Sequence, residues 1–487
     1  MISRLSLVIV ASPLLLAACA SVPPQGLQSP LAGFSTVDER TRSVTGKSAV
    51  WVQNATEAQA ASTRVRSLVK SKTVSADAAV QVALLNNKGL QAAYAEIGIA
   101  GAGLWQETLP PNPSVGIGIS GIDPVQVVES AVVQNIMSAI TRPRRVAVAE
   151  TRFRQSQLVA AEATLRLAAE TRSAWIEAVA AKERLIYLGQ AQASAEASSD
   201  LARKLGQTGA FTKTQQAREQ VFYAELSGQT AQAKLAARVA RENLSRTMGL
   251  WGNDLDYALP SALPKLPARA GTRKSIEAEA LRNRVDLQIA KLELEALAKS
   301  YGLTQATRYV SDVSLLAGVE LEREVEEEDG RTETTWKPVP RLDAELTIPI
   351  FDTGQARMRQ AEMAYMRAAN LLAERAVNIR SEARQAFDAR QSSYEIARHY
   401  RNSVVPLRKA VAEQATLTYN GMITNTFELL ADNRAKSEAL LMSVNAKRDF
   451  WLADAAMKTA IYGGAGGSVA VAGGEAAAPA ASSGGGH

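Results

Sequence analysis

Apolar residues recur at every seventh position along two long stretches of the chain. A heptad repeat keeps one stripe of a helix against a partner helix in a left-handed supercoil. The pattern therefore predicts two long packed helices, and the proline-free stretch 144–207 alone would form a rod of about 96 Å at ~1.5 Å per residue. The two series are Val146, Phe153, Ala160, Leu167, Ala174, Ala181 and Leu188, then Met358, Tyr365, Leu372, Ile379, Ala386, Ser393 and Tyr400.

The second series belongs to a copy of the first. Ala149-Glu150 matches Ala361-Glu362, an offset of 212 positions (361 − 149), and several later matches keep that offset. Upstream, residues 83–90 resemble 280–287 at an offset of 197 (280 − 83), so the second copy holds 15 extra residues (212 − 197) before its long helix. Constant register indicates a duplicated structural unit. We expect two tandem repeats, at 73–262 and 263–462.

A Gly-x-x-Thr-x-Thr segment follows each long helix, and helical sequence then resumes. Glycine favours a left-handed helix end, and threonine hydroxyls can cap the next helix. Each segment therefore predicts the tip of a helical hairpin, and the hairpins are expected at about 144–249 and 354–461. The tip residues are Gly209, Thr212 and Thr214 in the first copy, and Gly421, Thr424 and Thr426 in the second.

Alternation with period two precedes each long helix and predicts strands. Val115, Ile117 and Ile119 alternate with small residues, and 310–351 holds two alternating runs around the acidic segment 326–330. Strands are expected at about 112–141 and 310–351, although 125–141 is equally compatible with helix. The alternation fits a soluble core and a membrane equally well. Four strands cannot close a barrel, whereas twelve strands from three chains would enclose a passage.

The N-terminus resembles an export signal. Arg4 precedes an apolar stretch at 5–16 that is too short to span a membrane as a helix, and Leu16-Ala17-Ala18-Cys19 follows. We expect a signal peptide at 1–18, and Leu16-Ala17-Ala18-Cys19 resembles a bacterial lipobox, in which the cysteine is lipidated. The alternative is an ordinary signal peptide with a cysteine near its cleavage site by chance. Residues 19–72, which contain Pro23-Pro24, are expected to form an extended tether. The Gly, Ala and Ser-rich residues 463–487 are expected to be disordered.

Composition argues against several function classes. Aromatic residues make up 5% and charged residues 21% of the chain, which is typical of long helices rather than a compact enzyme. The net charge of +6 is spread over alternating Arg and Glu, which indicates solvated helix faces and not a nucleic-acid surface. One cysteine and two histidines, His399 and His487, offer neither a disulfide nor a His-rich metal site. We expect no enzyme activity, no metal and no cofactor, and no window elsewhere is apolar enough for a membrane-spanning helix.

Five short motifs occur in a fixed order within this duplicated unit. They are the lipobox ending at Cys19, Ala-Leu-x-x-Asn from Ala83, Pro110-x-Asn112-Pro113, the Ile-Pro-Ile-Phe-Asp-x-Gly segment 348–354, and Tyr419-x-Gly421. Over about residues 72–462 the chain resembles the TolC-like outer-membrane efflux proteins. The resemblance implies a mainly α fold with a β part. Three chains would join four strands each into a twelve-stranded transmembrane β-barrel in the outer membrane, continuous with an α-barrel of coiled-coil hairpins in the periplasm.

The same resemblance implies a function. The homotrimer would be a passive exit duct for solutes in a tripartite efflux or type I secretion system, held to outer-membrane lipid by a palmitate-bearing Cys19. A periplasmic adaptor and an inner-membrane transporter would be its partners, and the hairpin tips their docking place, although turn chemistry alone also explains the tip residues. The alternative is a periplasmic adaptor-like lipoprotein that links the transporter to the outer membrane, which should have one hairpin rather than two.

Two carboxylates after the second tip, Glu428 and Asp432, are candidates for a narrow aperture. The family commonly has Leu-Asp-Ala here, whereas this chain reads Leu429-Leu430-Ala431-Asp432. Three converging copies of Asp432 would repel one another and attract cations. An exposed polar face of an ordinary helix is the other interpretation. The sequence does not indicate whether the cargo is a drug, a metal ion or a polypeptide.

Overall fold

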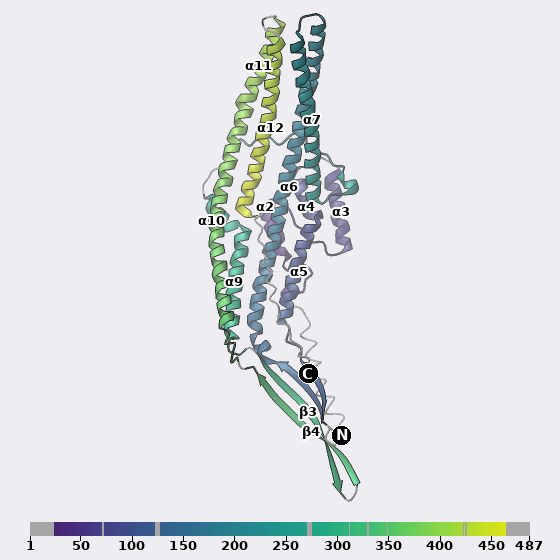
Figure 1. Ribbon diagram of the computed structural model, residues 1–487, viewed down its shortest axis with the longest axis vertical. Coiled ribbons are helices and arrows are strands. Elements are labelled where there is room, and N and C mark those ends of the chain that lie inside the picture. The colour runs from purple at the N-terminus through teal and green to yellow at the C-terminus, as the bar shows by residue number, and fades with distance from the viewer. Residues whose placement is uncertain are drawn as a thin grey trace.

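A computed structural model describes residues 24–70, 73–121, 127–269, 275–310, 312–328, 331–347, 349–421, 423 and 426–463. Within these ranges the chain is a long rod in which helices run along the major axis and a sheet occupies one end (Figure 1). The expected signal peptide, Cys19, Thr424 and the Gly-rich tail beyond 463 lie outside the described residues.

The elements follow one another in two similar series. The first series is α4 (Ala76–Asn86), α5 (Lys88–Thr108), β1 (Ser114–Ser120), β2 (Val127–Asn135), α6 (Ile136–Gln207) and α7 (Lys213–Met248). The short turn η2 (Gly252–Leu255) follows. The second series is α8 (Ile276–Asn283), α9 (Val285–Ala306), β3 (Val313–Glu328), β4 (Arg331–Leu346), α10 (Gln355–His399), η3 (Tyr400–Val404), α11 (Val405–Asn420) and α12 (Thr426–Tyr462). The duplication seen in the sequence is therefore also a duplication of elements.

The long helices of the two series accommodate a proline in different ways. α6 begins at Ile136, earlier than expected, because Asn135 caps it by accepting a 2.7 Å bond from the amide of Ser138, and Pro143 lies inside it. Residues 127–135 are strand and 136–141 are helix, which resolves the open interpretation of that segment. In the second series the five-residue π-helical turn η3 ends two residues before Pro406. A proline lacks the N–H of a regular helix and clashes with the preceding turn, which a wider π turn accommodates.

The expected extended tether is wrong for residues 24–70. This segment contains η1 (Gln25–Leu27), α2 (Phe34–Thr45) and α3 (Ala55–Lys70), and it packs against the helices. Phe34 and Val37 are buried with Tyr94, and Val65 and Val69 are buried in another cluster. Apolar residues three or four positions apart form one helical stripe, and burial of that stripe stabilises these helices.

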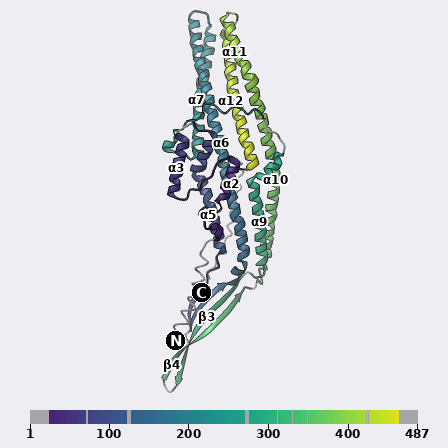
Figure 2. The ribbon, with the colours of Figure 1, turned by 180° about the vertical axis from the view of Figure 1, so that it is seen from behind.

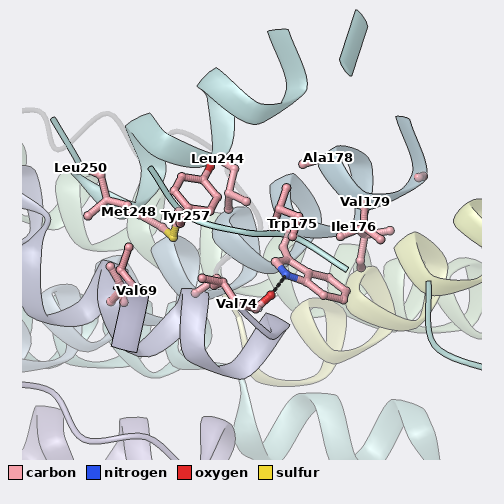
Figure 3. Close-up of a cluster of buried hydrophobic side chains, with 14 of the residues drawn as sticks. Val69, Val74, Trp175, Ile176, Ala178, Val179, Leu244, Met248, Leu250 and Tyr257 are labelled. Carbon is pink, nitrogen blue, oxygen red and sulfur yellow. Dashed lines mark hydrogen bonds between the residues drawn. The ribbon is translucent and has the colours of Figure 1, made fainter. Parts of the chain in front are cut away.

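Hydrophobic clusters follow one another along the rod, and the largest joins α3, α4, α6, α7 and α12. At its centre the indole Nε1 of Trp175 donates a 2.8 Å hydrogen bond to the carbonyl oxygen of Val74 (Figure 3). Leu244 and Met248 of α7 are fully buried beside it. This cluster fixes the N-terminal segment, both hairpins and the loop after α7 to one another midway along the rod.

The four strands form one antiparallel sheet in the order β1-β2-β3-β4. Among the described residues, the β2–β3 pairing ends at Val127 opposite Glu322, whereas the β3–β4 pairing continues to Glu328 and Arg331. The β3–β4 hairpin thus projects beyond the other two strands (Figures 1 and 2). Among the described helices, none combines the length and the apolar character that a membrane-spanning helix requires.

Candidate functional site

The first hairpin tip is a compact, capped turn at the end of the rod opposite the sheet (Figure 1). Gly209 adopts a left-handed backbone (φ +76°), as expected. The amide of Gln215 donates to Thr212 Oγ1 (3.3 Å) and the Gln215 side chain accepts from the Thr212 amide (2.9 Å), which forms a capping box at the start of α7. Thr214 is exposed on the first turn of α7. Two of the three predicted residues therefore build this turn.

The second tip differs from the first. Gly421 has φ −79°, so the expected left-handed glycine is wrong at this position. The reason is local. The Gly421 amide still donates to the carbonyl oxygen of Leu417 (2.9 Å), as in a helix, and the amide of Ile423 donates to the carbonyl oxygen of Thr418 (2.9 Å). Thr426 is the first residue of α12, and the structure describes its backbone only.

Both tips carry an apolar side chain that the sequence analysis did not single out. Phe211 in the first tip and Ile423 in the second are 212 positions apart (423 − 211), and 78% of Ile423 is exposed. An apolar residue in the same position of both Gly-x-x-Thr segments was the available signal. Ile423 is exposed and Phe211 is half-buried, so both leave apolar contact area for a partner at the end of the rod.

The two predicted carboxylates lie on one face of α12, since Glu428 and Asp432 are four residues apart. Glu428 is exposed in the first helical turn, where a negative charge interacts favourably with the helix dipole. Asp432 is partly buried.

A third carboxylate, which sequence reasoning missed, pairs with a residue of α12 two positions after Asp432. Glu219 of α7 is only 4% exposed and forms a 2.6 Å ion pair with Arg434 of α12. The guanidinium of Arg434 also lies 3.9 Å from the ring centre of Phe222. Glu219 Oε2 and Arg434 Nε are buried and have no hydrogen-bond partner among the residues that the structure describes. This pair joins the two hairpins close to their tips. Burial of the Glu219 charge would be costly without the opposite charge of Arg434.

A second buried pair joins the hairpins nearer the middle of the rod. Lys447 of α12 donates to Glu183 of α6 at 2.6 Å, and the other Glu183 oxygen accepts the amide of Leu263 at 2.9 Å. Glu183 is 5% exposed, so both its oxygens are satisfied inside the protein. The two pairs hold α12 against the first hairpin at two levels.

At the other end of the rod, the sheet has one apolar face that no described part of the chain covers. The side chains of Ile117, Ile119 and Leu342 are 77%, 76% and 72% exposed. Strand alternation and the pairing register place these apolar residues on the same face: Val115, Ile117, Ile119, Val128, Val132, Leu315, Ala317, Val319, Leu321, Leu342, Ala344 and Leu346. The charged residues of this part of the sheet lie on the opposite face.

Among the described residues, no group of three or more His, Cys, Asp and Glu side chains could hold a metal ion. Burial raises the pKa of Tyr94 well above its ordinary value, and a hydrogen bond between its hydroxyl and that of Thr164 only partly offsets this effect. Its position inside a packed cluster makes Tyr94 a core residue. The features that can carry function are thus the tips, the ion pairs between the hairpins and the two-faced sheet.

No protein-family model and no curated protein matches the chain. Solved outer-membrane channels do. The CmeC outer membrane channel of Campylobacter jejuni is 18% identical, with a TM-score of 0.65 over 80% of this chain and 85% of that chain. The outer membrane protein VceC of Vibrio cholerae is 15% identical, with a TM-score of 0.65 over 80% of this chain and 96% of that chain.

The open state of the MtrE outer membrane channel of Neisseria gonorrhoeae is also similar, at 17% identity and a TM-score of 0.62 over 82% of this chain and 89% of that chain. Identities this low establish the fold. The likeness covers 85% or more of each of these three channels. The chain therefore has the fold of the TolC-like outer-membrane channels, as its sequence motifs predicted.

Proposed function

We propose that the chain is the outer-membrane channel component of a tripartite efflux or type I secretion system, and that three copies form a passive exit duct for solutes. The observation that carries this proposal is the junction of two tandem helical hairpins with a sheet whose apolar face is exposed, in the fold of outer-membrane channels. The chain would catalyse no reaction, because its role is to enclose a passage.

The sheet supports a trimer. β1 and β4 each have a single pairing partner among the described strands, so both edges of the sheet are open. Open edges are available for pairing with another chain. Twelve strands from three chains would close these edges and leave a passage, whereas eight strands would be filled by their own side chains.

The dimensions of the apolar face fit a membrane. From Val313 to Arg323 the strand would extend about 34 Å at ~3.4 Å per residue, which at a tilt of ~40° is a height of about 26 Å. Transmembrane barrels have apolar bands of about 25 Å flanked by aromatic residues. Trp336, which pairs with Arg323, lies beyond one end of the band, and the exposed Tyr309 and Phe351 lie beyond the other.

The N-terminus would anchor the same assembly. We propose that cleavage after residue 18 leaves Cys19 as a lipidated first residue in the outer membrane. Residues 24–70 pack along the helices, which leaves only 20–23 between the anchor and the packed segment. Mass spectrometry of the N-terminal peptide should find an acylated cysteine, and a Cys19→Ser variant should lose that mass. An unmodified Cys19 in the mature protein would contradict the anchor.

The tips would dock the periplasmic adaptor through which an inner-membrane transporter loads the duct. Phe211 and Ile423 provide apolar contact area, and Gly209 and Thr212 fix the turn that presents it. A photo-reactive residue at Ile423 should capture the adaptor in cells, whereas the same residue at the exposed Tyr309 beside the sheet should not. Equal capture at both positions would contradict tip docking.

The narrow part of the duct would lie beside the tips. Glu428 and Asp432 of three chains would provide carboxylates there, and the Glu219–Arg434 pair would hold α12 against α7 in the narrow state. Release of solutes should therefore be limited by this pair. The adaptor-like lipoprotein remains the second candidate, but two tandem hairpins and an uncovered apolar sheet favour the channel.

A release experiment tests the proposed function. The purified full-length protein is inserted into liposomes loaded with a small neutral sugar, and release is followed with time. We expect slow release with the wild type and faster release with Arg434→Ala, while Arg203→Ala, which removes an exposed pair with Asp200, should behave as the wild type. No release by any of the three inserted proteins would contradict a channel.

A further inference from the structure

The polar face of the sheet carries a cluster of charges around one arginine. Arg341 of β4 donates from Nε to Asp343 at 2.6 Å, and its Nη1 lies 3.4 Å from Glu129 of β2 and 3.9 Å from Glu320 of β3. Between 23% and 46% of each of these side chains is exposed. The cluster lies outside the hairpins and takes no part in the tip geometry described above.

Small residues lie in register with Arg341 on the neighbouring strands. The register places Gly116, Ala131, Gly318 and Arg341 in one row over the four strands. A Cβ on Gly318 would lie 2.3 Å from the carbonyl oxygen of Ser130, so only glycine fits there. Gly318, which is opposite Arg341, has no side chain of its own, and the arginine side chain reaches across β3 to Glu129, two strands away.

The neighbouring row pairs two like charges. Glu129 and Glu320 are directly opposite each other in the β2–β3 register. Like charges in this arrangement repel each other and destabilise a sheet. Arg341 is a counterion that both carboxylates share, and its distances of 3.4 and 3.9 Å exceed those of a good charge-assisted hydrogen bond. One guanidinium among three carboxylates leaves a formal charge of −2 per chain (1 − 3).

We propose that this cluster makes the sheet end of the passage selective for cations, with Glu129 and Glu320 as the attracting residues and Arg341 as the residue that limits their charge. The inference rests on the proposed function, because the apolar face must meet lipid for the polar face to line the passage. Three chains would then place three such clusters around the same level. A carboxylate excess in a water-filled passage attracts small cations and repels anions.

Reversal potentials in planar lipid bilayers test this inference. The full-length protein and its variants are inserted from detergent, and a gradient of potassium chloride gives the permeability ratio of K⁺ to Cl⁻. The wild type should prefer K⁺. The double variant Glu129→Gln, Glu320→Gln should lower the ratio by about twofold or more, since three chains lose six charges, and high salt should reduce the difference. Arg341→Gln should raise the ratio.

The control keeps the charge: Glu320→Asp should leave the ratio within the error of the wild type. An unchanged ratio in the Glu129→Gln, Glu320→Gln variant, with conducting channels present, would overturn the inference while the proposed function stands. If the wild type and the Arg434→Ala variant both insert as trimers and neither conducts, the proposed function and this inference are both contradicted. An equal change of the permeability ratio in Glu320→Asp would also overturn the inference, because that variant keeps the charge and alters only the shape of the side chain.

Discussion

Replacement of Arg434 by alanine should loosen the contact between the two hairpins near their tips. Among the described residues, the change removes the ion-pair partner of Glu219, which is 4% exposed, and the cation that lies over Phe222. Loss of one partner of a fully buried pair costs about 3–5 kcal/mol. Because Arg434 is itself 29% exposed, water can reach the vacated position, and we expect about 2–3 kcal/mol.

Hydrogen exchange followed by mass spectrometry measures this cost locally. At 1.4 kcal/mol for each factor of ten, peptides from the first turns of α7 and α12 should exchange roughly 30- to 150-fold faster in Arg434→Ala. Glu219→Gln should have a smaller effect, because a neutral amide needs no counterion. The double variant Arg434→Ala, Glu219→Ala should be less affected than the sum of the single variants, since it leaves no buried charge.

The matched control is Arg203→Ala. Arg203 and Asp200 of α6 are 3.1 Å apart, yet both are about 60% exposed, at 61% and 59%. Exposed pairs contribute at most about 1 kcal/mol and often much less. Exchange should change by less than about threefold in this variant. If Arg434→Ala exchanged no faster than Arg203→Ala, burial of the Glu219 charge would not hold the hairpins together.

Three further changes test other parts of the structure. Gly209→Ala should destabilise its tip by about 1 kcal/mol because φ is +76°, whereas Gly421→Ala at φ −79° should be nearly neutral, as hydrogen exchange of the tip peptides would show. Burial, with the nearby Asp286 charge, raises the pKa of Glu162 above its ordinary value of 4.5, so Glu162→Gln should unfold at a higher temperature than the wild type at neutral pH. The stability that protonated Glu162 provides is present below pH 4.5 and is lost as pH rises through the raised pKa. The difference in unfolding temperature between Glu162→Gln and the wild type should therefore disappear in acid. A difference that stayed constant with pH would refute this. Leu342→Arg on the apolar face should reduce liposome insertion at a cost of about 2–4 kcal/mol per chain, while Glu345→Arg on the opposite face should insert normally.

The sequence predicted those elements whose signal is local or periodic. Heptads placed the long helices α6 and α10, and the constant offset of 212 between Ala149 and Ala361 revealed the duplication. Alternation placed β1 and the β3–β4 hairpin. Each of these signals lies within one element, where side chains repeat along a fixed geometry.

Features that depend on distant contacts were not predictable in this way. Glu219 and Arg434 are 215 positions apart, and nothing in either segment marks the other as its partner. The prolines before α2 and α3 predict an extended tether, whereas burial against the hairpins decides their structure. The left-handed glycine was predicted correctly at Gly209 and wrongly at Gly421, because the same residue type can also continue a helical hydrogen-bond pattern.

The number of chains in the detergent-solubilised particle tests the central proposal most directly. Native mass spectrometry of the mature full-length protein gives this number without any assumption about cargo or partners. We predict three chains, whose twelve strands close the edges at β1 and β4 and enclose a passage. A particle of one or two chains would contradict the account, since four strands cannot close a barrel and eight would leave no duct.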